Sequence, residues 1–159
     1  MQSLSPWQPE IAKALIEERR TMPGAVIPIL HALQDRFGFV HKDAVPMIAE
    51  ALNLTRAEIH GVVTFYHDFR SAPPGRHVVK VCRAESCQSM GCDSLIAHIE
   101  KKVGTTLKHT SVDNAVTLEP VYCLGNCALS PALMWNGELH GKVTPQKFDR
   151  LHKAKVSGR

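Results

Sequence analysis

The sequence is poor in aromatic residues and contains no long apolar run. Phe, Trp and Tyr make up 6% of its 159 residues, and no basic stretch carries the interleaved aromatic side chains on which bases stack. We therefore expect no nucleic acid among its partners. Because no apolar run approaches the roughly 20 residues that a membrane-spanning helix needs, we also expect no direct insertion into a membrane.

We also expect no targeting signal. The first residues lack the basic segment and apolar core of a secretory signal, and Glu10, Glu17 and Glu18 argue against an organelle transit peptide, which is poor in acidic residues. We therefore expect a cytoplasmic protein in a reducing compartment, where structural disulfides are rare. The cysteines number five, and an odd count also fits a disulfide framework poorly.

Several catalytic motifs are missing too. The sequence has neither a Gly-x-Ser-x-Gly nucleophile turn nor a Gly-x-x-x-x-Gly-Lys phosphate loop. It also lacks the Cys-x-x-Cys pair of a thioredoxin-type reductase. None of the histidines forms a Cys-x-His pair, which argues against a Rieske-type site. What remains is the pattern of a carrier protein rather than a catalyst.

The N-terminal half of the chain has the apolar period of helices. Four stretches show it: 7–20, 26–37, 43–52, and a fourth that starts at Thr55. Gly38 lies where a helix C-terminal cap belongs, and Thr55 with Glu58 forms a capping-box pattern. We expect the apolar side chains of the fourth helix, through Tyr66, to be buried. These stripes predict a compact helical domain over residues 1–74.

Two prolines and a glycine at Pro73-Pro74-Gly75 break the helical pattern. After them the sequence predicts strands at 77–81 and 115–121, separated by a helix over 88–103. Asn136-Gly137 predicts a hairpin, and Thr144-Pro145 predicts the start of a last helix. The expected order is β-α-β-β-β-α, which defines a second domain over residues 75–159.

Four cysteines form two short runs, each behind an expected strand. Cys82 and Cys87 have four residues between them, and Cys123 and Cys127 have three. If the two strands lie side by side, both loops leave the same edge of the sheet, and four sulfurs meet in one small volume. Such a group is what a four-thiolate metal site needs.

Spacing alone leaves two metal centres open. Zinc takes four cysteines in a tetrahedron, commonly from pairs separated by two residues, whereas a 2Fe-2S cluster takes two cysteines on each iron. The spacings here favour iron–sulfur modestly, and a zinc-stabilised interaction module or a thiol-redox protein remains an alternative. Cys92 is a fifth candidate ligand, although a buried cysteine in a helix is its more ordinary interpretation.

A family resemblance narrows this choice. It is carried by three stretches besides the first cysteine run: Gly61-Val62-Val63-Thr64-Phe65-Tyr66, Cys123-Leu124-Gly125-Asn126-Cys127 and Val143-Thr144-Pro145. The chain resembles the thioredoxin-like 2Fe-2S subunits of NAD-linked redox complexes. That family includes subunits of respiratory complex I, of NAD-reducing hydrogenases and of NAD-dependent formate dehydrogenase (its gamma subunit). The run from Cys82 to Gly91 looks most like the formate dehydrogenase branch.

The resemblance implies an α+β protein with an N-terminal bundle of about four helices and a thioredoxin-like α/β domain. It implies one 2Fe-2S cluster held by Cys82, Cys87, Cys123 and Cys127, with Cys92 outside the ligand set. The expected partners are a subunit that binds FMN and NAD and carries further iron–sulfur clusters, and a larger formate-oxidising subunit. The chain would transfer single electrons and would not catalyse a reaction alone. An equivalent subunit of a hydrogenase or of complex I is the alternative.

Overall fold

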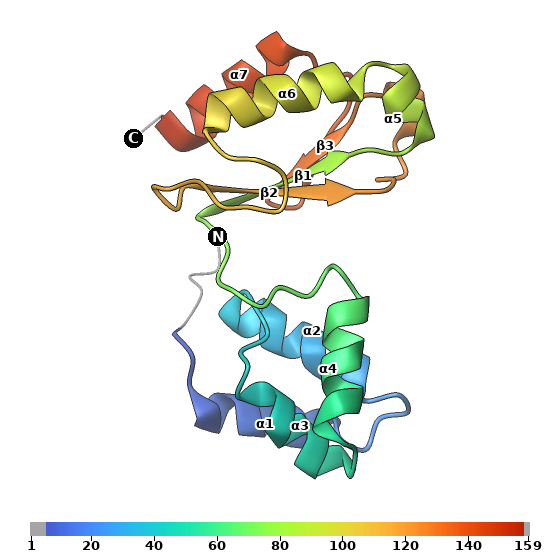
Figure 1. Cartoon of the computed structure of the whole chain (residues 1–159), viewed down its shortest axis with the longest axis vertical. Coiled ribbons are helices and arrows are strands. Elements are labelled where there is room, and N and C mark those ends of the chain that lie inside the picture. The colour runs from blue at the N-terminus through green and yellow to red at the C-terminus, as the bar shows by residue number, and fades with distance from the viewer. Residues whose placement is uncertain (1–5, 158–159) are drawn as a thin grey trace. The chain divides into compact units, whose positions relative to one another are not determined.

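The first unit of the chain is a bundle of short helices. The computed structural model describes residues 6–157 (Figure 1), and it divides the chain into the compact units Met1–Pro73 and Pro74–Arg159. The helices of the first unit are α1 (Pro9–Arg19), α2 (Val26–Phe37), α3 (Ala44–Leu52) and α4 (Arg56–Phe65). Their fully buried side chains include Ile29, Leu30, Leu33, Ile48 and Ile59, so the apolar stripes form the core of this unit.

The expected helix ends are confirmed by their caps. Gly38 has a left-handed φ of 84°, and its N–H donates to the Gln34 carbonyl at 2.7 Å. The Glu58 N–H donates to Thr55 Oγ1 at 3.2 Å, and the Thr55 N–H donates to the Glu58 carboxylate at 2.8 Å. Both halves of the capping box are therefore present.

The expected burial of Tyr66 is wrong. Helix α4 ends at Phe65, and Tyr66 leaves it in an extended conformation. Its side chain is 48% exposed, and that of Phe65 is 74% exposed. The apolar side chains of α4 have therefore left the core by Phe65, the last residue of the helix, and Tyr66 no longer lies on a helical face.

The second unit is built on a four-stranded sheet with the strand order β2-β1-β3-β4. The strands are β1 (His77–Cys82), β2 (Val116–Val121), β3 (Leu133–Trp135) and β4 (Glu138–His140). β1 pairs with β2 in parallel and with β3 antiparallel, and β3 pairs antiparallel with β4. Asn136 and Gly137 turn the β3–β4 hairpin with φ values of 50° and 85°, as the Asn-Gly pair predicts.

Helices cover one face of this sheet. Figure 1 shows α6 (Cys92–Val103) and α7 (Pro145–His152) lying side by side over the strands. Thr144 caps α7 by accepting from the Lys147 N–H at 3.2 Å. The last described turn, η2 (Lys153–Ser157), continues α7. No helix within residues 6–157 is both long and apolar enough to span a bilayer.

The helix expected over residues 88–103 is two helices in the structure. Helix α5 (Glu85–Ser89) already contains Cys87, and α6 starts only at Cys92. Gly91 separates them with a left-handed φ of 80°, a conformation that ends one helix and redirects the chain into the next.

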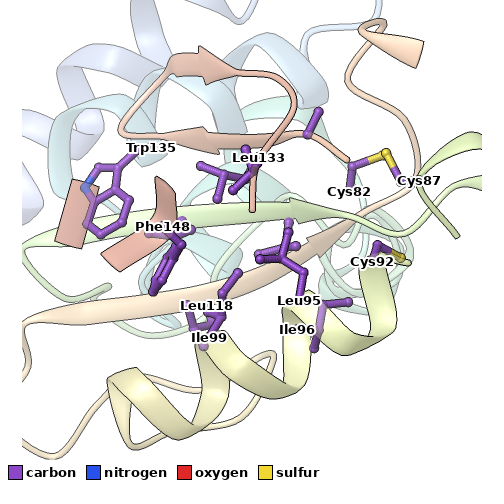
Figure 2. Packing of buried hydrophobic residues seen from close by; sticks show 14 of the residues in the cluster. Cys82, Cys87, Cys92, Leu95, Ile96, Ile99, Leu118, Leu133, Trp135 and Phe148 are labelled. Atoms are coloured by element: carbon purple, nitrogen blue, oxygen red, sulfur yellow. The ribbon is translucent and has the colours of Figure 1, made fainter. Parts of the chain in front are cut away.

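The core of the second unit extends to the cysteines. Figure 2 shows Trp135 and Phe148 at one end of this core and Cys82, Cys87 and Cys92 at the other. The two aromatic rings lie 5.7 Å apart, and neither side chain has exposed surface. The packing that holds α6 and α7 on the sheet therefore continues without a break to the first cysteine run.

Candidate metal centre

The parallel pairing of β1 and β2 places both cysteine runs at one edge of the sheet. Cys82 is the last residue of β1, and it is in register with Val121, the last residue of β2. Cys123 follows two residues later. The Arg83 N–H donates to the Val121 carbonyl at 2.8 Å, so the segments that follow β1 and β2 are still hydrogen-bonded to each other where they leave the sheet.

The first cysteine pair is buried. Cys82 is 3% exposed and Cys87 is 2% exposed. Burial raises the pKa of the Cys82 thiol, against hydrogen bonds from the backbone of Ala84 and Cys123. Burial acts in the same direction on Cys87, but its hydrogen bonds with Ser130, with Cys82 and with the backbone of Ala132 outweigh burial and lower the pKa of Cys87. Of these two thiols, Cys87 therefore loses its proton more readily than Cys82.

The second pair is exposed and lies in a tight loop. The Sγ atoms of Cys123 and Cys127 are 3.7 Å apart, and the Gly125 N–H donates to the Cys123 sulfur at 3.3 Å. Gly125 has a left-handed φ of 72°, and Cys123 itself has a φ of 104°. A non-glycine residue in that region stores on the order of 1–3 kcal/mol of strain, which is typical of a residue held for a functional reason.

The other three thiols all act on Cys127. The pKa of Cys127 is raised by its hydrogen bond with Cys123, by the charge of Cys123 and by the charges of Cys82 and Cys87. Within residues 6–157, no three His, Cys, Asp or Glu side chains lie close enough together to hold a single metal ion. The thiols are instead grouped as two pairs at one sheet edge, one buried and one exposed.

This arrangement fits a 2Fe-2S cluster. Such a cluster takes two thiolates on each iron, and each run supplies two. Backbone N–H groups near sulfur stabilise the negative charge of a cluster, and here they reach Cys82, Cys87 and Cys123. The donor set is soft, as iron–sulfur chemistry requires.

Cys92 lies in the same buried core as Cys82 and Cys87. It is the first residue of α6, has no exposed surface, and packs in the same core as Leu95 and Ile96 (Figure 2). Its pKa is raised by burial, then by the charges of Asp93 and Cys87. Packing at the start of α6 therefore accounts for a cysteine at this position.

Two residues that support the cysteine loops were not predicted from the sequence. Ser130 has a hydroxyl 3.5 Å from the Cys87 sulfur, and Gly141 lies under the second cysteine loop. An added Cβ at Gly141 would be 2.6 Å from Leu129 Cβ and 2.9 Å from the Leu129 carbonyl oxygen. The Lys142 N–H donates to that same carbonyl at 2.6 Å. Neither residue belongs to a motif, because both act through contacts made far along the chain.

We expect Gly141→Ala to lower the free energy of unfolding by about 1–3 kcal/mol, the usual cost of forcing atoms into a packed site. The backbone of Leu129 has to move to admit the new methyl group, and it carries the cysteine loop with it. Urea denaturation followed by circular dichroism measures the change. Gly61→Ala is the matched control, because a Cβ there meets nothing within 4 Å and alanine favours the helix. Equal stability of the two variants would contradict this account.

Known proteins resemble this chain in sequence and fold. Residues 12–155 match the family described as thioredoxin-like 2Fe-2S ferredoxin. One subunit of the NADH-quinone oxidoreductase of Pseudomonas aeruginosa is 39% identical over 132 residues, which cover 83% of this chain and 80% of the relative. The HndA subunit of the NADP-reducing hydrogenase of Solidesulfovibrio fructosivorans is 26% identical over 136 residues, which cover 86% and 80% respectively.

A solved structure shows the same fold. The crystal structure of an NAD⁺-reducing NiFe-hydrogenase in the air-oxidised state matches with a TM-score of 0.72 and 22% identity over 89% of this chain. The matched part is 24% of that longer hydrogenase chain. The expected fold class, helices followed by a thioredoxin-like α/β domain, is confirmed. With nearly its whole length matched, the chain belongs to the thioredoxin-like 2Fe-2S ferredoxin family.

Proposed function

We propose that this chain is the 2Fe-2S electron-transfer subunit of an NADH-linked oxidoreductase complex, with Cys82, Cys87, Cys123 and Cys127 as the cluster ligands. The observation that carries the proposal is the pairing of these thiols at one sheet edge in a chain of this family. When bound, the cluster supplies a one-electron carrier. No other catalytic group is required of the chain.

The residues around the centre have separate tasks. Cys82 and Cys87 are buried and would hold the cluster on the side of the core, while Cys123 and Cys127 are exposed and would hold it on the side of the surface. Backbone N–H groups compensate the thiolate charge, as at Gly125. A redox group on a partner can therefore approach the centre from the side of the second cysteine loop. The partner that fits is a subunit that binds FMN and NAD.

The parent complex is best sought among the NADH-quinone oxidoreductases and hydrogenases. The names of the relatives reported above support this assignment. The proposal of a formate dehydrogenase, with its larger formate-oxidising subunit, is supported only by the likeness of the run from Cys82 to Gly91. It is therefore less well supported than the other two parent complexes. In each case we propose a peripheral subunit on the cytoplasmic side. Mass spectrometry of the proteins that co-purify with the chain separates the three parents.

We expect the purified chain to be brown and to contain about two irons and two sulfides. It should be free of an EPR signal when oxidised and give the signal of a single unpaired electron when reduced, because one electron is shared between two irons. Iron and sulfide assays with EPR on the dithionite-reduced protein check this. A colourless protein with one zinc per chain favours the zinc-stabilised interaction module. Disulfide reductase activity that persists without metal favours a thiol-redox protein.

A further inference from the structure

Ser130 lies where the two cysteine runs meet. It directly follows η1 (Cys127–Leu129) and is 8% exposed. Its Oγ is 3.5 Å from the Cys87 sulfur, 2.8 Å from Ser86 Oγ and 2.8 Å from the Cys127 carbonyl oxygen. A single hydroxyl therefore contacts a ligand of the first run and the backbone of a ligand in the second.

The protons of this network can be counted. Ser86 Oγ is also 3.0 Å from the Cys127 carbonyl, so two hydroxyls face that one oxygen. While Cys87 is a thiol, its S–H donates a hydrogen bond to Ser130 Oγ, and the Ser130 hydroxyl donates to the Cys127 carbonyl. A cysteine bound to iron is a thiolate and has no proton to give. Two acceptors, the Cys87 sulfur and the Cys127 carbonyl, then face two hydroxyl protons, and the carbonyl also accepts from the Ser130 N–H at 3.3 Å.

We propose that Ser130 is a positioning residue whose hydroxyl donates a hydrogen bond to the iron-bound sulfur of Cys87. This hydrogen bond raises the reduction potential of the cluster. The Ser86 hydroxyl frees Ser130 for this hydrogen bond, because Ser86 donates to the Cys127 carbonyl in its place. The proposal rests on the proposed function, since it takes Cys87 as a ligand. Reduction adds negative charge to the centre, and a donor to sulfur stabilises the more negative state more strongly. Because Cys87 is 2% exposed, the bond lies away from water, where it is electrostatically stronger.

The test is a redox titration of the full chain with its cluster, followed by EPR. At the wild-type midpoint, the ratio of reduced to oxidised cluster should fall about tenfold in Ser130→Ala, which for a one-electron couple is about 59 mV. Ser130→Thr keeps a hydroxyl and should restore the wild-type ratio. Ser86→Ala should give a shift of the same sign but smaller, because the Ser130 proton is then divided between the sulfur and the carbonyl.

Ser89→Ala is the matched control. The Ser89 hydroxyl donates to the Ser86 carbonyl at 2.9 Å. Ser89 lies in the same short helix as Ser86, but its hydroxyl contacts neither Cys87 nor Cys127. The midpoint potential of the Ser89→Ala variant should therefore equal that of wild type. A Ser130→Ala cluster with an unchanged midpoint overturns the proposal, as does a Ser130→Thr variant that shifts as far as the alanine variant. If Ser130→Ala does not retain a cluster, Ser86→Ala decides by the same measurement. Wild-type protein without iron refutes the proposed function instead.

Discussion

Replacing Cys127 by serine is expected to reduce the iron content from about two per chain to near zero after desalting. The variant loses one soft thiolate from a set in which each iron needs two. Cys127 is the best ligand for this experiment because it is exposed, so its substitution leaves no cavity in the core. Iron and sulfide assays measure the loss, and circular dichroism shows that the fold is retained.

Cys92→Ser is the control for this experiment. The new hydroxyl is buried at a site with no exposed surface, which costs on the order of 1–3 kcal/mol of stability, yet the iron content should remain at about two. Cys87→Ser should lose iron like Cys127→Ser. Iron lost from the Cys92 variant and kept in the Cys87 variant would reverse the assignment of these two residues.

Leu133→Ala is expected to lower the free energy of unfolding of the second unit by about 2–5 kcal/mol, through lost burial and the cavity left behind. Leu133 has no exposed surface and pairs in register with Val81 of β1. Its neighbour Ala132 accepts from the Cys82 N–H at 3.1 Å. The cavity therefore opens next to the buried cysteine pair, and the cluster should also be lost faster to an iron chelator.

Leu139→Ala provides the same change on the other strand of the same hairpin. Leu139 is 44% exposed, so this variant should stay within about 0.5 kcal/mol of wild type. Urea unfolding followed by tryptophan fluorescence measures both, because Trp135 is fully buried in the second unit. Replacing Trp7 by Phe removes the signal of the first unit. Equal losses in the two leucine variants would show that the hairpin is not held by this core.

The elements with local signals could be predicted from the sequence. Gly38 and the Thr55–Glu58 capping box mark helix ends through contacts within a few residues, and Asn136-Gly137 defines a turn by its own backbone preferences. The shared sheet edge of the two cysteine runs was also predictable, since each run follows a strand and parallel strands end together.

The features that depend on distant contacts could not be predicted. Nothing near Tyr66 in the sequence shows that α4 ends one residue earlier, and the left-handed Gly91 that divides α5 from α6 sits in an otherwise helical pattern. Ser130 contacts Cys87 across 43 positions of the chain, and Gly141 acts on Leu129. A serine or a glycine in a loop has no distinctive pattern, so only the folded structure shows what each one contacts.

The unequal exposure of the two cysteine pairs has a consequence for how the protein matures. Cys82 and Cys87 are buried, and Cys123 and Cys127 are exposed. With the proposed ligand set, we therefore expect iron to enter and leave the centre on the side where electrons are exchanged. A partner that docks over Cys123 and Cys127 would also shield the cluster from chelators and oxidants. In that case we expect cluster insertion to precede subunit assembly, and a chain that assembles without its cluster to be unable to acquire one.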